Sequence, residues 1–205
     1  MSTDYSATRR IGVLGGTFDP PHLGHLIIAT ELRHALSLDQ VLFVPAGQPP
    51  HKDEESVSDE VHRIAMVELA IANDPYFSLS TVDRDRVGPS YTADLLEILH
   101  RTLDPVSLVF LMGEDSLRDI PNWHEPNRIV HLAELGVAAR PGIPFNLGEI
   151  YAAVPAARDR IIRVATPEIA ISSRDLRQRV ASGTPITYQV PLAVERYIID
   201  QGLYR

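Results

Sequence analysis

The sequence predicts an α/β fold in which helices cover both faces of a doubly wound, mostly parallel β-sheet. Short, wholly apolar runs alternate along the chain with longer segments whose apolar residues recur at helical spacing. These runs lack the alternation with polar residues that a half-exposed strand shows, which indicates strands buried on both faces. Apolar residues make up 44% of the 205 residues and charged residues 22%, as in ordinary globular domains.

The first strand is expected at Ile11–Leu14, where an apolar run ends in two glycines. A helix is expected from Leu23 to Leu36, and a second apolar strand at Val41–Val44. Residues 1–9 are expected to form a flexible tail. This order of strand, turn, helix and strand is typical of a parallel sheet.

The same alternation continues to the end of the chain. We expect strands at 77–82, 106–112, 136–139 and 161–164, and helices at 58–73, 91–103, 175–181 and 191–201. No internal repeat or shift in composition divides the chain. Residues 10–205 are therefore predicted to form a single domain with a small C-terminal helical part.

Charge and composition exclude several classes of protein. A net charge of -8 disfavours binding to nucleic acid or to an anionic membrane, because both require a broad basic surface. The chain has no cysteine and no apolar run of the roughly 18 residues that span a bilayer. We expect a cytoplasmic protein that acts on small anionic molecules, and a homo-oligomer remains open.

The most informative segment reads Gly-Gly-Thr-Phe-Asp-Pro-Pro-His-Leu-Gly-His over residues 15–25. Glycines let backbone amides approach a phosphate closely, and Thr17 adds a hydroxyl donor. His22 and His25 lie three residues apart where a helix begins, so both rings can face one point beside its N-terminal amides. No third ligand of suitable spacing accompanies the two histidines, so no metal site is predicted.

This segment resembles the signature of the HxGH nucleotidyltransferases, a family of Rossmann-like α/β domains that transfer a nucleotidyl group from ATP or CTP to a phosphate acceptor. A second signature of that family resembles Ile-Ser-Ser-Arg-Asp-Leu-Arg at residues 171–177, where Arg174 replaces the usual threonine. The resemblance implies that His22, His25 and Arg177 are catalytic. It also implies an ATP site formed by Gly15, Gly16, Thr17, Phe18, His22, His25, Ile171, Ser172, Ser173 and Arg177.

The segment from Met112 to Trp123 resembles the Met-Gly-x-Asp-x-Leu…Trp segment of nicotinate mononucleotide adenylyltransferases, with Glu114 in place of a more usual alanine. By that resemblance Gly113 and Asp115 contact the adenosine of ATP. The same resemblance implies that Trp123 stacks on the pyridine ring of the acceptor, although core packing is an equally good explanation for a tryptophan.

Three further matches to this family concern the acceptor. Ser90, Tyr91 and Thr92 resemble its Ser-Tyr-Thr motif, although a helix start with a hydroxyl cap explains them too. Lys52 resembles a lysine that approaches the acceptor phosphate, and a solvated loop lysine is the alternative. Arg140 matches a family position at a strand end.

The resemblance implies that ATP and nicotinate mononucleotide give nicotinate adenine dinucleotide and pyrophosphate, with Mg²⁺ carried by the ATP phosphates. Nicotinamide mononucleotide is an alternative acceptor. Phosphopantetheine is another, but the enzymes that use it typically have threonine at the position of His22. A nucleotide sensor without catalysis is the alternative from a different class.

Overall fold

The computed structural model describes residues 8–48, 57–84, 86, 88–139 and 145–205. Its six strands form one sheet in the order β3-β2-β1-β4-β5-β6, and every pairing between them is parallel. The strands are β1 (Arg9–Gly16), β2 (Gln40–Pro45), β3 (Phe77–Leu79), β4 (Val106–Gly113), β5 (Ala133–Ala139) and β6 (Ile161–Ala165). The predicted α/β class is confirmed, and the sheet is more uniformly parallel than expected.

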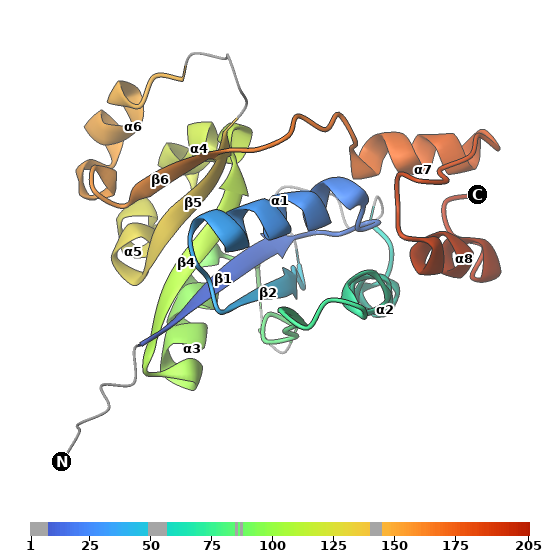
Figure 1. Ribbon diagram of the computed structural model, residues 1–205, viewed down its shortest axis with the longest axis horizontal. Coiled ribbons are helices and arrows are strands. Elements are labelled where there is room, and N and C mark those ends of the chain that lie inside the picture. The colour runs from blue at the N-terminus through green and yellow to red at the C-terminus, as the bar shows by residue number, and fades with distance from the viewer. Residues whose placement is uncertain (1–7, 49–56, 85, 87, 140–144) are drawn as a thin grey trace.

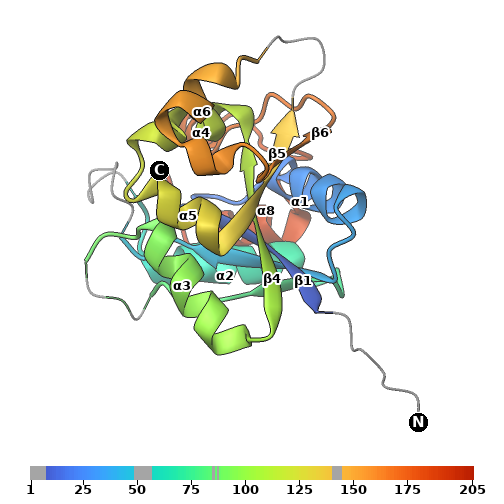
Figure 2. The ribbon, with the colours of Figure 1, turned by 90° about the vertical axis from the view of Figure 1, so that its left-hand side faces the viewer.

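Helices cover both faces of this sheet (Figures 1 and 2). One face packs against α1 (Leu23–Ala35) and α2 (Glu60–Ile71). The other packs against α3 (Thr92–Leu103), α4 (Glu114–Asp119), α5 (Pro126–Leu132) and α6 (Gly148–Ala153), with two 3-10 turns at Ile120–Asn122 and Pro155–Ala157. Successive strand residues point to opposite faces, so each apolar strand contributes to both cores.

β4 illustrates this division clearly. Leu108 and Phe110 belong to the core under α3 and α5, whereas Val109 and Leu111 belong to the core under α1 and α2. A strand buried in this way needs apolar residues at every position, which is why its sequence shows no alternation.

The last two helices, α7 (Ser173–Ala181) and α8 (Leu192–Asp200), lie together to one side of the sheet (Figure 1). They have a small core of their own, in which Leu176, Val194 and Ile198 pack against Met66 of α2. The predicted C-terminal helical part therefore shares its core with α2.

Most predicted elements coincide with observed ones, and the differences have local causes. β1 begins at Arg9, inside the predicted tail of residues 1–9, while residues 1–7 lie outside the described ranges. β3 ends at Leu79 because Thr81 accepts a backbone hydrogen bond from Arg84 and the chain turns. The helices α4, α5 and α6 were not predicted from the sequence. Over the ranges that the structure covers, every helix is too short or too polar to cross a bilayer.

Candidate active site

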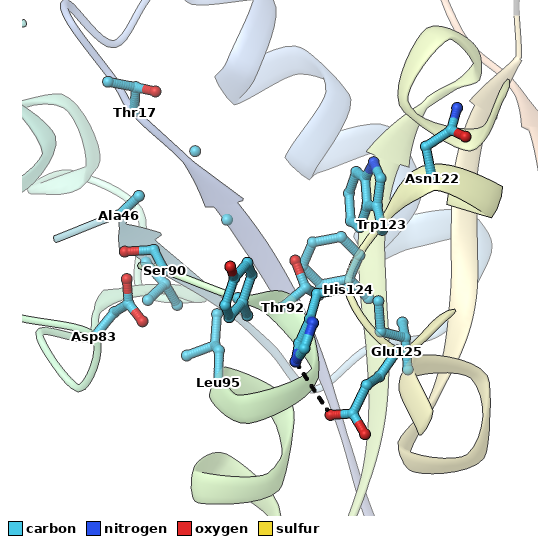
Figure 3. A pocket seen from close by; sticks show the side chains of 16 residues that line it. Thr17, Ala46, Asp83, Ser90, Thr92, Leu95, Asn122, Trp123, His124 and Glu125 are labelled. Atoms are coloured by element: carbon cyan, nitrogen blue, oxygen red, sulfur yellow. Dashed lines mark ion pairs between the residues drawn. The ribbon is translucent and has the colours of Figure 1, made fainter. Parts of the chain in front are cut away.

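The sheet contains one point at which its strand order reverses. The chain moves from β1 outward to β2 and β3, and then returns to β4 beside β1 before moving outward in the other direction. Ligands of open α/β sheets bind in the crevice that such a reversal leaves at the carboxyl ends of the strands. A cavity of about 720 Å³ lies at this position, a size suited to a small molecule (Figure 3).

The cavity has two unlike walls. One is the end of β1 and the loop after it, Gly15 to Thr17. The other contains Ser90, Tyr91 and Thr92 from the start of α3, and Asn122, Trp123, His124 and Glu125 from the segment after α4. In Figure 3, Thr17 lies on one side of the cavity and Trp123 on the other. The structure thus brings together two sets of predicted site residues that are more than 70 positions apart in the chain.

Aromatic side chains form much of the second wall. Tyr91 stacks on His124, with ring centroids 4.1 Å apart and an interplanar angle of 26°. Trp123 is half-buried and meets Phe110 edge to face at 6.0 Å. Trp123 therefore both packs on the core and lines the cavity, so the two explanations of this residue are compatible.

Phe18, which the resemblance assigns to the ATP site, has its side chain in the core. Its backbone is left-handed, with φ of 52°, and its ring is 2% exposed. The ring packs against Phe43 and against the edge of His25. A Cβ atom on Gly16 would come within 3.1 Å of this ring, so this glycine leaves room for Phe18. A contact between Phe18 and ATP would therefore involve the backbone of Phe18.

His22 and His25 form a stacked pair where α1 begins. Their ring centroids lie 3.7 Å apart, and the His22 backbone N–H donates to Nδ1 of His25 over 3.1 Å. A Cβ atom on Gly24 would come within 3.0 Å of the His22 ring, so this glycine makes room for the pair. Because Nδ1 of His25 accepts a hydrogen bond, its neutral ring carries the proton on Nε2.

Burial sets the protonation state of this pair. It lowers the pKa of His22 to about 4. Burial also lowers the pKa of His25 to about 3, with a smaller contribution from the neighbouring charge of His22. Both rings are therefore neutral near pH 7 in the free protein. Nδ1 of His22 is buried without a hydrogen-bond partner among the described residues. The pair can therefore form hydrogen bonds with a ligand, but it carries no full charge.

The second signature lies directly against the first. Ser172 caps α7 by accepting a hydrogen bond from the backbone N–H of Asp175, at 3.1 Å. Ser173 donates its hydroxyl to the carbonyl oxygen of Pro20 at 2.8 Å, and Arg177 donates to the carbonyl oxygen of Asp19 at 2.7 Å. Residues 153 positions apart in the chain thus meet at the start of α1. Ile171 is partly buried, and Arg174 is exposed.

The predicted adenosine contacts lie at the same edge of the sheet but do not line the cavity. Gly113 ends β4, and a Cβ atom placed on it would meet nothing within 4 Å. Asp115 is exposed and pairs with Arg118 at 3.3 Å. Glu114 is buried and pairs with Arg163 of β6, so it is part of a structural ion pair. Lys52 and Arg140 lie outside the described residues.

Arg63 is a residue that the sequence analysis missed. It is 2% exposed, and its guanidinium donates to the carbonyl oxygens of Thr17, Ala46, Gly47 and Ser58. It thereby ties α2 to the loops that follow β1 and β2. A signal was available, because an arginine at this position interrupts the apolar face that Val67 and Ile71 form at helical spacing.

Asp83 is a second missed residue, and it is 3% exposed. One carboxylate oxygen accepts from the backbone N–H of Gly47 at 3.0 Å, and the other pairs with Arg86 at 2.8 Å. Arg86 also pairs with Asp94 of α3 at 2.7 Å. Asp83 therefore fixes the loop after β2 relative to the start of α3.

A parallel sheet of this order, a glycine loop after β1 and paired histidines at a helix start together define a nucleotidyltransferase-type α/β domain. Residues 13–179 match the family model described as cytidylyltransferase-like, and the chain belongs to that family.

Two of its similar relatives carry the name "Probable nicotinate-nucleotide adenylyltransferase". The protein from Thermomicrobium roseum is 57% identical over 196 residues, covering 96% of this chain and 92% of the relative. That from Roseiflexus sp. (strain RS-1) is 48% identical, covering 95% and 98%. Within the cytidylyltransferase-like proteins, the chain is thus a member of the nicotinate-nucleotide adenylyltransferase family.

Solved structures agree in fold. The Plasmodium falciparum nicotinic acid mononucleotide adenylyltransferase complexed with NaAD aligns with a TM-score of 0.76 at 20% identity, covering 96% of this chain and 97% of that one. A structure from Vibrio parahaemolyticus, a putative nicotinate-nucleotide adenylyltransferase, aligns with a TM-score of 0.67, covering 97% and 96%.

Proposed function

We propose that the protein transfers the adenylyl group of ATP to nicotinate mononucleotide, which gives nicotinate adenine dinucleotide and pyrophosphate. Membership of the nicotinate-nucleotide adenylyltransferase family supports this activity. The observation that carries the proposal is a single cavity with the glycine loop of the first signature on one side and the aromatic wall of Tyr91, Trp123 and His124 on the other. Such a cavity suits a reaction that joins two nucleotides.

The reaction forms a bond between a phosphate oxygen of the acceptor and the α-phosphorus of ATP. The bond from that phosphorus to the bridging oxygen of pyrophosphate breaks. The acceptor phosphate is largely ionised at neutral pH, so no general base is required. The protein's work is to align two anions and to stabilise the negative charge that develops on pyrophosphate.

The two signatures supply groups for this work. Nε2–H of His25 and the guanidinium of Arg177 can both donate hydrogen bonds to phosphate oxygens. Because both histidines are neutral near pH 7, Arg177 rather than the histidine pair supplies a fixed positive charge at this position.

We propose that Mg²⁺ enters as part of the MgATP substrate. Asp19 is the acidic residue of the first signature, and it does not fit the role of a metal ligand. It is 1% exposed, and its two carboxylate oxygens accept hydrogen bonds from Tyr204 and from the backbone of Ser58. A magnesium ligand needs an oxygen that can face the ion.

The start of α3 favours the acid over the amide as acceptor. Thr92 is the first residue of this helix and lines the cavity, so the positive end of the helix dipole lies at the cavity wall. The acidic residue in that first turn, Asp94, pairs with Arg86 at 2.7 Å and with Arg128 at 2.9 Å. Because these pairs offset the charge of Asp94, the helix terminus can attract the nicotinate carboxylate.

A pyrophosphate-release assay tests the proposal. ATP is offered with nicotinate mononucleotide, nicotinamide mononucleotide or phosphopantetheine, and we expect kcat/KM to be highest with the nicotinate. Trp123→Ala should raise the KM for the pyridine nucleotide, and Trp123→Phe should restore part of the stacking. Absence of turnover with both pyridine nucleotides would refute the function.

The proposal also covers the cell compartment of the protein and the molecules that it binds. We propose that the protein acts in the cytoplasm, which the absence of cysteine supports. The net charge of -8 supports small anionic substrates over nucleic acid or a membrane. That the protein forms a homo-oligomer remains a prediction, and analytical sedimentation would measure the oligomeric state.

A further inference from the structure

Asp19 belongs to the first signature and is buried where that signature meets the second. Its carbonyl oxygen accepts a hydrogen bond from Nη1 of Arg177, and its carboxylate lies 3.7 Å from the same nitrogen. Both contacts involve one nitrogen of a guanidinium that has five N–H groups. Asp19 therefore orients the guanidinium of Arg177, and the other N–H groups of that guanidinium can face a phosphate.

Asp19 is in turn fixed by a residue from the far end of the chain. The hydroxyl of Tyr204 donates to Oδ1 of Asp19 at 2.6 Å, across 185 positions of sequence. The other carboxylate oxygen accepts from the backbone N–H of Ser58 at 3.2 Å. Hydrogen bonds to a carboxylate are among the stronger ones in proteins, so these two contacts define the orientation of the side chain.

Two properties of Tyr204 suit it to this contact. Its backbone is left-handed, with φ of 64°, which is unfavourable for a bulky residue and must be offset by the contacts of the side chain. Burial and, to a lesser extent, the charge of Asp19 raise the pKa of Tyr204 well above its usual value. The hydroxyl therefore keeps its proton near neutral pH and stays a donor.

We propose that Tyr204 is a positioning residue of the phosphate site, because its hydroxyl orients Asp19 and Asp19 orients Arg177. The inference rests on the proposed function, since it concerns how ATP is held. It gives the segment after α8 a part in ATP binding, although that segment lines no part of the cavity.

Tyr204→Phe tests the proposal, because it removes the hydroxyl and keeps the ring. We expect kcat/KM for ATP to fall on the order of tenfold, and KM for nicotinate mononucleotide to stay unchanged. Tyr197→Phe is the matched control. Its hydroxyl, on α8, bonds to Nδ1 of His62 at 2.9 Å and has no contact with Asp19 among the described residues. This control should keep the wild-type kcat/KM for ATP within about twofold.

The same substitution in an Arg177→Ala background separates positioning from general packing. Affinity for a non-reacting ATP analogue, α,β-methylene ATP, is measured by calorimetry in all four proteins of the cycle. If Tyr204 acts through Arg177, Tyr204→Phe has no further effect once Arg177 is gone. Effects that multiply would show that the hydroxyl acts independently of Arg177, and would overturn the proposal.

Asp19→Asn provides a second route that does not alter Tyr204. We expect a lower kcat/KM for ATP and an unchanged Mg²⁺ concentration at half-maximal rate. A raised Mg²⁺ requirement would make Asp19 a metal ligand and overturn its positioning role, as would wild-type kinetics in Tyr204→Phe.

The failure of this proposal and that of the proposed function remain distinguishable. A wild-type protein without turnover refutes the function alone, because calorimetry still measures the contribution of Tyr204 to binding of the analogue. Should Tyr204→Phe not fold, Asp19→Asn in the same cycle with Arg177→Ala tests the contact of Asp19 with Arg177, on which the role of Tyr204 depends. Effects that multiply in that cycle would overturn the proposal.

Discussion

At the scale of the residue, the paired histidines are the centre of the proposed chemistry. His25→Ala removes the Nε2–H donor and the acceptor that holds the His22 backbone. We expect turnover to fall on the order of hundreds-fold, as for other lost contacts to developing charge. His34→Ala, at an exposed position of the same helix, is the control and should keep full activity. Equal activity of both variants would give His25 a purely structural role.

The same pair predicts how stability depends on pH. The pKa of each ring is lower in the folded protein, about 4 for His22 and about 3 for His25, than the ordinary 6.5. The unfolded chain therefore binds more protons below pH 6.5, so stability is fully present above that pH and falls toward pH 4. The slope is up to about 1.4 kcal/mol per pH unit for each ring.

Urea unfolding at pH 7, 6 and 5 measures this slope. His25→Gln should make it shallower, because one of the two rings is gone. His34→Gln, which changes an exposed histidine, should leave it as in the wild type. A slope that both variants share with the wild type would mean that the buried pair does not control acid stability.

Residues of the site differ in how far the sequence could predict them. His22, His25 and Trp123 belong to local motifs, whose spacing alone indicates a function. The contacts of Tyr204 and most of the contacts of Arg63 involve partners that are distant in the chain, so the local sequence does not show what these side chains bind. The burial of Phe18 was missed because its left-handed backbone turns the ring toward Phe43, and the sequence does not show that backbone conformation.

At the scale of the element, Arg63 attaches α2 to the loops of the site. Arg63→Met keeps the bulk of the side chain but leaves buried carbonyl oxygens, including those of Thr17 and Ala46, without their donor. We expect the free energy of unfolding to fall by about 3 kcal/mol or more, since each buried unsatisfied group costs about 1–3 kcal/mol. Denaturant titration is the measurement.

A matched control for this prediction lies on α3. Arg101→Met removes an exposed arginine whose ion pair with Glu97 is four residues away on the same helix. Surface pairs of this kind are worth about 0.3–0.5 kcal/mol, so this variant should unfold almost like the wild type. Similar losses in the two variants would mean that Arg63 does not fasten the loops.

Replacing a glycine by alanine should lower stability at one of two positions on neighbouring strands and leave it unchanged at the other. In Gly136→Ala on β5, the new Cβ atom would meet Leu36 at 2.8 Å and Leu111 at 2.9 Å, so stability should fall by about 1–3 kcal/mol. In Gly113→Ala the methyl meets open space, so stability should hold.

If Gly113 contacts adenosine as proposed, its alanine variant should nevertheless bind ATP more weakly. Thermal unfolding and the KM for ATP, measured on both variants, separate the two effects. An unchanged KM in Gly113→Ala would remove Gly113 from the ATP site.

The elements that the sequence did not predict share one property. α4, α5 and α6 have six or seven residues each, which is fewer than two turns. A helical period cannot be recognised over so short a stretch. The long strands and helices were predicted well, because burial on both faces of β1, β2 and β4 forces continuous apolar runs that few other structures produce.

At the scale of the whole molecule, the small core of α7 and α8 should link stability to ATP binding. Leu176→Ala empties a fully buried position in that core and should cost about 2–5 kcal/mol. Because α7 carries Ser173 and Arg177 onto the first signature, KM for ATP should rise as well.

The matched substitution is Leu99→Ala, which lies in the core on the far side of the sheet. It should cost a similar free energy of unfolding and leave KM for ATP unchanged. Urea unfolding measures the loss of stability in each variant, and steady-state kinetics measures its KM for ATP. Together they show whether KM rises because of the C-terminal core or because of a general loss of stability. If both variants raise KM for ATP alike, the C-terminal helices have no special part in the ATP site.

The contact of Tyr204 with Asp19 also has a consequence for synthesis on the ribosome. Translation adds roughly 5–20 residues per second, so the glycine loop emerges roughly 10–40 seconds before the residue that completes its support. During that interval β1 to β5 can already form, because their pairings need no residue beyond β5. A nascent chain could thus have a nearly complete sheet before Tyr204 is available to support the nucleotide site.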